Sequence, residues 1–226
     1  DHRMIHPDTG GRLQAAGMHR FSRFLFPALP LSTLLTYNAL MQNMPPPPDS
    51  AAQFKASSIM LTLNIATVGI MSLPDRPGIA GLLLGAIGRR SVNAHFVVEL
   101  TDNTNRSHIV IGVSETDLGE ALSAVQDIAS RIQFSEVVHQ RDVVLVSIHG
   151  PHFRDRPGCA AEAFAAIAAA GVNILAISTS VSSISCLVEK HNLNTVIKSL
   201  QHHFGVSDDG VLVAEDGLAR PWRLCR

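Results

Sequence analysis

From about residue 58 onward, stretches with the apolar spacing of a strand alternate with stretches with the apolar spacing of a helix. The same order of stretches occurs twice. In the first pass, a β-like apolar run is followed by apolar residues three and four apart, which predict one buried face of a helix: Ile79, Leu82, Leu83, Ala86 and Ile87. Two strands, a second amphipathic helix and a short strand come next. The elements predicted for this pass lie at 63–71, 79–87, 93–100, 107–113, 118–129 and 136–140.

The second pass repeats that order of elements with slightly shorter connections. Its predicted elements lie at 143–150, 157–170, 173–180, 183–189 and 192–204. Polar residues stand where helices are expected to begin, so Thr116 or Asp117 is predicted to cap the second helix of the first pass and Asn192 that of the second.

A four-residue sequence, Asp-Arg-Pro-Gly, marks both passes at the same place. It begins at Asp75 and again at Asp155, 80 residues later, and each copy stands directly before a helix. A Val-Asn pair follows each of these helices, at Val92 and Val172, again 80 residues apart. The matched spacing indicates a duplicated βαββαβ unit.

A βαββαβ unit of this size predicts the ferredoxin-like arrangement, in which both helices cover one face of a four-stranded antiparallel sheet. We therefore expect an α+β protein with two such units packed side by side, because pairing covers faces and edges that a single unit leaves open. The expected units span 58–140 and 141–217, and 218–226 form a tail. The irregular segment 1–57 includes a proline-rich linker at Met44–Ser50, which the prolines hold extended.

Composition narrows the classes of function. A formal net charge of −1, with 16% charged residues, disfavours nucleic acid and anionic membranes as partners. The apolar stretch Phe24–Met41 is interrupted by Pro27 and Pro30, so no membrane span is expected. Three cysteines without paired spacing and scattered histidines predict no metal site, and a cytoplasmic location, or an organellar stroma, fits best. No catalytic motif is found, so no catalytic residue is expected.

The repeated turn carries the chemistry that the sequence offers. It leads into a helix N-terminus, whose free backbone N–H groups and positive dipole end attract a carboxylate. Gly78 and Gly158 allow close approach to the backbone, and Asp75 or Asp155 offers a carboxylate to an ammonium group. A free amino acid matches both features. The alternative is that the aspartate caps the helix and the turn binds nothing.

Two other sets of polar residues are candidates for ligand contact. Asn93 and Asn173 begin corresponding strands, where an amide either contacts a ligand or tolerates an unusual φ in a turn. Ser178, Thr179 and Ser180 end the second of these strands, and their hydroxyls either reach a ligand or lie on an exposed face.

These residues together resemble the tandem ACT regulatory region of aspartokinases. The resemblance runs from Leu63 to Val206 and is most specific where ISTS, SISCLVE and SLQHHFG follow one another in the second unit. A weaker similarity, at Met4–Met18, is to the segment that ends the aspartokinase catalytic domain.

The resemblance implies an allosteric region that senses the end products threonine or lysine and controls the aspartate pathway to lysine, threonine and methionine. This chain has Glu99-Leu100 where the family typically places Gln-Asn. It has Val181 where the family typically places an acidic residue, so threonine is favoured over lysine. The implied effector-binding residues are Asp75, Pro77, Gly78, Ile79, Ala80 and Asn93 on one side and Asn173, Ile174, Ser178, Thr179 and Ser180 on the other.

The same resemblance implies the partners. It predicts a homo-oligomer formed through ACT pairing and an association with an aspartokinase catalytic subunit or domain. No cofactor is expected in this chain, because ATP and Mg²⁺ would bind to the kinase domain. Two alternatives stay open: a stand-alone ACT-type amino-acid sensor for another enzyme, and a structural dimerisation module whose ligand sites are inactive.

Overall fold

The computed structural model describes residues 55–151, 153, 157–215 and 218–222. The predicted linker at Met44–Ser50, nearly all of the predicted segment 1–57, and two residues of the second turn, Asp155 and Arg156, lie outside the described residues. The strands are β1 (Ser58–Pro74), β2 (Phe96–Thr101), β3 (Arg106–Ser114), β4 (Glu136–His149), β5 (Ala176–Thr179), β6 (Ser183–Glu189), β7 (Val211–Glu215) and β8 (Leu218–Pro221). The α-helices are α3 (Ile79–Arg89), α4 (Leu118–Asp127), α5 (Cys159–Ala169) and α6 (Leu193–Phe204).

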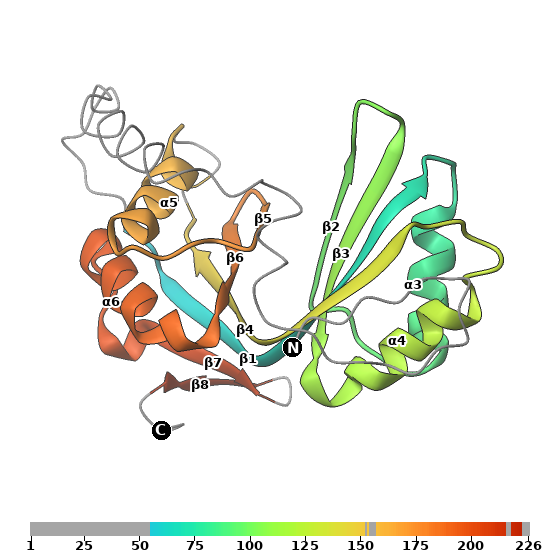
Figure 1. Cartoon of the computed structure of the whole chain (residues 1–226). Coiled ribbons are helices and arrows are strands. Elements are labelled where there is room, and N and C mark those ends of the chain that lie inside the picture. The colour runs from blue at the N-terminus through green and yellow to red at the C-terminus, as the bar shows by residue number, and fades with distance from the viewer. Residues whose placement is uncertain (1–54, 152, 154–156, 216–217, 223–226) are drawn as a thin grey trace.

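All described strands belong to one strongly twisted sheet, ordered β2-β3-β1-β4-β6-β5, with β7 beside β1 and β8 beside β7. Helices α3 and α4 cover the outer face at one end of this sheet, and α5 and α6 cover the outer face at the other end (Figure 1). We call these the first and second lobes. The order β4-β1-β3-β2 in the first lobe, with two helices on one face, confirms the predicted ferredoxin-like α+β fold.

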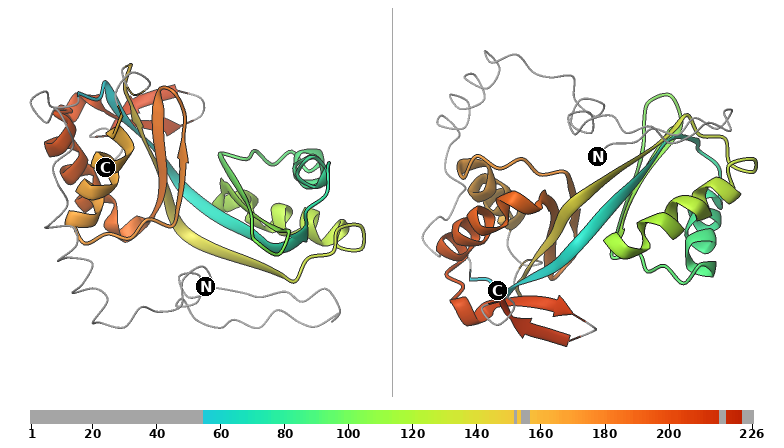
Figure 2. Two further views of the ribbon diagram at one scale, coloured as in Figure 1. Left: turned by 90° about the horizontal axis from the view of Figure 1, so that it is seen from above. Right: turned by 60° about the horizontal axis from the view of Figure 1, so that its bottom comes forward.

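Two long strands run through both lobes, which the separate predicted strands did not anticipate (Figure 2). The last part of β1, around Thr67–Met71, pairs with the first part of β4, whereas Ser58–Thr62 pairs with the last part of β4 and with β7. Each strand changes lobes near a residue with positive φ, Asn64 at 54° and Asp142 at 56°. Asparagine and aspartate tolerate this left-handed conformation better than most residues.

The first residues of β1 therefore belong to the second lobe. Ile59 and Leu61 are fully buried in its core, against α5 and α6, and they form an extra strand between β7 and β4. The predicted first unit, 58–140, includes both residues, so the structure differs from that boundary. Local periodicity shows that Ile59 and Leu61 are buried in a strand, but it does not show which helices cover them.

Each lobe has its own hydrophobic core between sheet and helices. The first core includes Ile70, Leu73 and Leu83, and the second includes Leu61, Leu200 and Phe204. A third, smaller cluster of Ile65, Phe96, Val143, Leu145 and Leu187 lies on the opposite face of the sheet, where Leu175 and Ala176 also pack. This cluster joins the starts of β2 and β5, so the inner faces of the two lobes meet there.

The predicted helix caps are corrected in detail. Asn192 does stand at the N-cap of α6, but its side chain makes no capping hydrogen bond. Thr116 lies inside a short 3-10 helix, Glu115–Asp117, and Asp117 at the N-cap of α4 also makes no side-chain cap. In both lobes a 3-10 turn leads directly from a strand into the helix and takes the place of a side-chain cap.

Candidate effector site

The turn before α3 has the open geometry that the sequence predicts. Gly78 is the N-cap of α3 with φ 92°, and its carbonyl accepts a 2.9 Å hydrogen bond from the backbone N–H of Leu82. A side chain with a Cβ rarely adopts this φ, and no other atom lies within 4 Å of where a Cβ would stand. The position thus combines a backbone conformation that favours glycine with free space beside the helix N-terminus.

Gly158 repeats this arrangement in the second lobe. It is the N-cap of α5 with φ 97°, and its carbonyl accepts a 3.0 Å hydrogen bond from Glu162 N–H. The space beside it is likewise open. Asp155 of this second turn lies outside the described residues.

The side chain of Asp75 does not cap α3, so the capping part of the alternative interpretation is wrong, while ligand binding at the turn stays a prediction. No side chain makes a capping hydrogen bond to this helix, and Asp75 itself is exposed. Its backbone N–H instead donates to the carbonyl of Asn105 over 3.3 Å, which fastens the turn to the β2–β3 hairpin. Within the described residues, the backbone N–H groups of Ala80 and Gly81 form no hydrogen bond. They are donors suited to a bound carboxylate.

A histidine bridge that the sequence pattern did not indicate holds this hairpin. His108 Nε2 lies 3.1 Å from Asp102 Oδ2, and His108 Nδ1 accepts a 3.4 Å hydrogen bond from the backbone N–H of Ser72. Because Nδ1 is the acceptor, the ring proton is on Nε2 and is donated to Asp102. Ser72 has φ 56° and lies just before the turn, so the bridge fixes the irregular end of β1.

Hydrogen bonds from Thr104, His108 and the backbone N–H of Arg106 hold the pKa of the Asp102 carboxyl well below its usual range. The folded state therefore prefers the charged form, and this stabilisation is present above the ordinary value of 3.8 and is lost as the pH falls below it. We expect the wild type to be more stable than Asp102→Asn at pH 7, and this difference to shrink as the pH falls below about 4. Urea unfolding at several pH values measures it, with the half-buried-site variant Asp117→Asn as control. A difference independent of pH would contradict the assignment.

Asn93 and Asn173 are exposed and stand just before the starts of β2 and β5. Neither has the unusual backbone predicted in the turn alternative, because the positive φ values fall two residues earlier, at Ser91 (58°) and Gly171 (73°). Ile174 is half-buried and packs against the second-lobe core. The two asparagines thus flank the cluster at which β2 and β5 meet.

The Ser180 hydroxyl forms hydrogen bonds within the β5–β6 turn, whereas Ser178 and Thr179 are exposed residues of β5. The Ser180 hydroxyl accepts hydrogen bonds from the backbone N–H of Ser183 (3.0 Å) and of Ser182 (3.3 Å), and it lies 2.8 Å from the Ser183 hydroxyl. Ser180 therefore shapes the β5–β6 turn. Ser178 stands opposite Ser185, whose hydroxyl lies 2.8 Å from that of Ser147 on β4. This row of serines crosses one face of the second lobe.

The predicted site residues do not converge within one chain. Phe96, at the start of β2, pairs with Gly112, which pairs with Thr67, so Asn93 lies beside the middle of β1. Asp75 follows the end of the same strand, about 25 Å away at the usual rise per residue. Asn173 and Ile174 lie at the start of β5, near Asn93, whereas Ser178, Thr179 and Ser180 lie at the far end of the second lobe.

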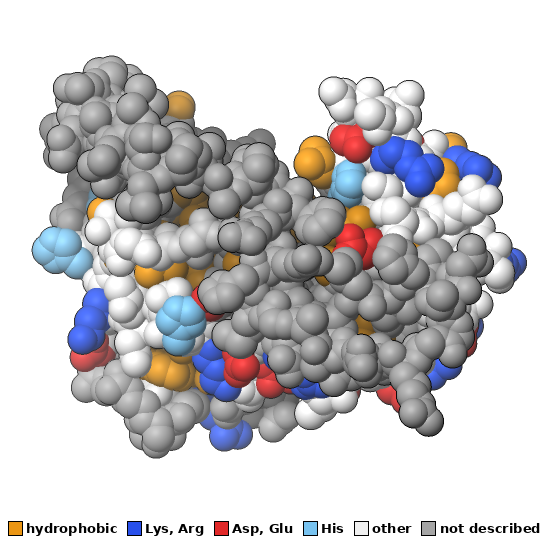
Figure 3. Space-filling model, viewed as in Figure 1, with side chains coloured by type: hydrophobic (Ala, Val, Ile, Leu, Met, Phe, Trp, Pro, Cys, Tyr) orange, Lys and Arg blue, Asp and Glu red, His pale blue; other side chains and the backbone are white. Residues whose placement is uncertain are grey.

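Charges and possible metal ligands add no further site of their own. On the face that Figure 3 shows, acidic and basic side chains of the described residues are interspersed, without a patch of one sign. Among these residues there is no group of three or more His, Cys, Asp or Glu side chains placed to hold a metal ion. The described part of the chain also contains no helix long and apolar enough to cross a membrane.

Comparison with known proteins gives one consistent picture. The sequence profile of the ACT domain family matches residues 146–204. An aspartate kinase of Stutzerimonas stutzeri is 30% identical over 156 residues, which are 69% of this chain and 38% of that protein. The regulatory subunit of aspartate kinase from Thermus thermophilus superimposes with a TM-score of 0.61 and 26% identity, over 66% of this chain and 98% of that one. An aspartate kinase structure from Synechocystis gives a TM-score of 0.65 at 25% identity, over 71% of this chain and 30% of that one. The chain thus spans about two fifths of the length of the curated relative it matches.

Proposed function

This chain belongs to the regulatory regions of aspartokinases that are built from ACT domains, and we propose that it binds a free amino acid as an allosteric effector of an aspartate kinase. The observation that carries the proposal is the turn at Asp75–Gly78. It combines an exposed aspartate that caps nothing, a glycine with open space beside it, and backbone N–H donors at a helix N-terminus.

In the proposed complex, the effector's carboxylate accepts hydrogen bonds from the backbone N–H groups of Ala80 and Gly81, whereas the Ile79 N–H donates to the Arg76 carbonyl within the turn. Its ammonium group binds the Asp75 carboxylate. Pro77 restricts the backbone of the turn, and Gly78 leaves the space beside the helix N-terminus free of a side chain. A helix N-terminus favours an anion through both its free donors and its dipole, so both ends of a zwitterion are recognised.

We propose that a second copy of the chain completes each site. Strands β2 and β5 end the sheet on either side, and each exposes an apolar side chain at the corresponding repeat position, Val97 at 39% and Ile177 at 41%. An exposed apolar edge strand favours pairing with another strand. If β2 of one chain runs antiparallel to β5 of another, the end of β2 meets the start of β5.

That pairing gathers the predicted residues in two kinds of site. The end of β2 lies beside the Asp75 turn, because Thr101 pairs with Ser107, which pairs with Leu73. The start of the partner's β5 would bring its own copies of Asn173 and Ile174 there. In the same antiparallel pairing, the start of β2 meets the end of β5 of the other copy. Asn93 would therefore lie near Ser178 and Thr179 of that copy and face its second turn at Gly158.

Val97→Lys is expected to convert a dimer or higher oligomer into monomers, because it places a charge at the centre of the proposed edge contact. Analytical ultracentrifugation measures the mass. Thr195→Lys, which adds the same charge on the exposed face of α6, is the control and should leave the oligomer intact. An unchanged oligomer for Val97→Lys would place the contact elsewhere.

We propose threonine over lysine as the effector. Val181 stands where the family typically has an acidic residue, which would suit the ε-ammonium group of lysine. Titration calorimetry of the wild type with threonine and with lysine tests the proposal. Saturable heat with threonine supports it, heat with lysine alone would reverse the preference, and heat with neither would favour the structural dimerisation module.

Catalysis is assigned to a kinase domain or subunit outside these residues, which also binds ATP and Mg²⁺. The effector acts by preferring one arrangement of the paired lobes, so it shifts the equilibrium only by its difference in affinity for the two arrangements. β1 and β4 pass through both lobes, so a change in their relative tilt at Asn64 and Asp142 is the simplest mechanical link. Cytoplasmic location and feedback control of the aspartate pathway fit this proposal.

A further inference from the structure

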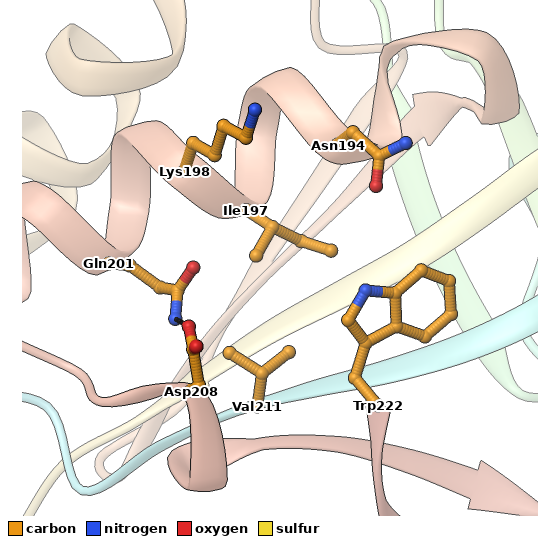
Figure 4. A pocket seen from close by; sticks show the side chains of 7 residues that line it. All are labelled: Asn194, Ile197, Lys198, Gln201, Asp208, Val211 and Trp222. Atoms are coloured by element: carbon orange, nitrogen blue, oxygen red, sulfur yellow. Dashed lines mark hydrogen bonds between the residues drawn. The ribbon is translucent and has the colours of Figure 1, made fainter. Parts of the chain in front are cut away.

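A cavity of about 300 Å³ lies in the second lobe, far from the Asp75 turn, between α6 and the strand pair β7–β8 (Figure 4). Its lining residues are Asn194, Ile197, Lys198, Gln201, Asp208, Val211 and Trp222. The volume is at the lower end of the range for small-molecule sites. The cavity therefore suits a ligand of amino-acid size.

One face of α6 supplies most of the polar lining. Asn194, Lys198 and Gln201 are four and three residues apart, so they project from the same side of the helix, above the buried side chain of Ile197. Val211 of β7 and the ring of Trp222 form the opposite, apolar wall (Figure 4). Trp222 is half-buried and packs against the second-lobe core, which fixes this wall.

Opposite charges stand across this cavity. Lys198 is exposed, and no ion pair or hydrogen bond of its ammonium group to another described residue is formed. Asp208 lies on the other side, where its Oδ1 accepts a 2.9 Å hydrogen bond from Gln201 Nε2. The side chain of Asn194 projects from α6 one turn before Lys198 (Figure 4).

We propose that this cavity is a second amino-acid site, which takes a small zwitterion with an apolar side chain. The ligand carboxylate binds the Lys198 ammonium and the Asn194 amide, its ammonium group faces Asp208, and its side chain packs on Ile197, Val211 and Trp222. Ligands with these three features are the apolar amino acids. The site is independent of the Asp75 turn, so it does not rest on the function proposed for that turn.

Trp222 is the single tryptophan of the chain, so its emission reports this cavity and no other tryptophan. We expect saturable changes in emission when the full chain is titrated with L-leucine, L-methionine or L-phenylalanine. Glycine lacks the apolar side chain and 4-methylpentanoate lacks the ammonium group, so both should bind more weakly by about tenfold or more.

Lys198→Gln should weaken the response by about tenfold or more, whereas Lys55→Gln and Asp75→Ala should leave it unchanged. Thermal shifts with the same three amino acids provide a second readout. Equal responses in Lys198→Gln and Lys55→Gln would overturn the proposal. So would a response that is lost in Asp75→Ala but kept in Lys198→Gln, because the ligand would then bind at the turn. Absence of both an emission change and a Lys198-dependent thermal shift with all three amino acids would also overturn it.

Discussion

Replacing Asp75 with alanine is expected to lower the affinity for the effector by about ten- to a hundredfold, which is the effect of losing one charge-assisted hydrogen bond. The fold should persist, because the Asp75 side chain is exposed and does not cap α3. Calorimetric titration measures the affinity, and thermal unfolding checks that the variant is folded.

Asp117→Ala is the matched control, since Asp117 is also an aspartate at the start of a helix but lies away from the turn. Its affinity for the effector should equal that of the wild type. Equal affinities of wild type and Asp75→Ala would show that the turn does not recognise the ammonium group, and the proposed binding mode would then be wrong.

Leu61→Ala and Leu73→Ala are each expected to lower the free energy of unfolding by about 2–5 kcal/mol, the usual cost of such a cavity. Both leucines lie on β1 and are fully buried, but Leu61 packs in the second-lobe core and Leu73 in the first. Leu61→Ala should therefore raise amide exchange mainly in α5 and α6, and Leu73→Ala mainly in α3 and α4.

Hydrogen exchange followed by mass spectrometry measures this difference, and each variant serves as the control for the other. If Leu61→Ala loosened α3 and α4 instead, the first residues of β1 would belong to the first lobe, and the shared arrangement of β1 would be contradicted.

Much of the fold could be predicted because each element has a local signal. The helix that begins at Ile79 is visible from apolar residues three and four apart, and the duplication is visible from the turns at Asp75 and Asp155. The path of β1 could not be predicted in this way. Strand pairing between Ile59 and Ile148 depends on residues 89 positions apart, and nothing in the local pattern around Ile59 specifies that partner.

The candidate site likewise combines features that the local sequence predicts with features that it does not. The backbone at Gly78 could be predicted, since a glycine before a helix with an open N-terminus is a local feature. The position of Asn93 relative to Asp75 could not, because α3 carries the chain about 16 Å to the other end of the lobe. The bridge from Asp102 through His108 to Ser72 joins three segments by side chains, and it leaves no periodic signal in the sequence.

Effector binding with mixed copies of two variants tests most directly whether two chains build each site. In the proposed site at the first turn, one chain supplies Asp75 and the other supplies Asn173. The Asp75→Ala homodimer and the Asn173→Ala homodimer should each bind weakly, because one of these two residues is missing from both of its sites. After the two are mixed and allowed to exchange subunits, heterodimers carry one intact site, so calorimetry should recover about one quarter of these sites with wild-type affinity. No recovery, in a mixture shown to contain heterodimers, would mean that Asp75 and Asn173 do not act in one site shared between copies.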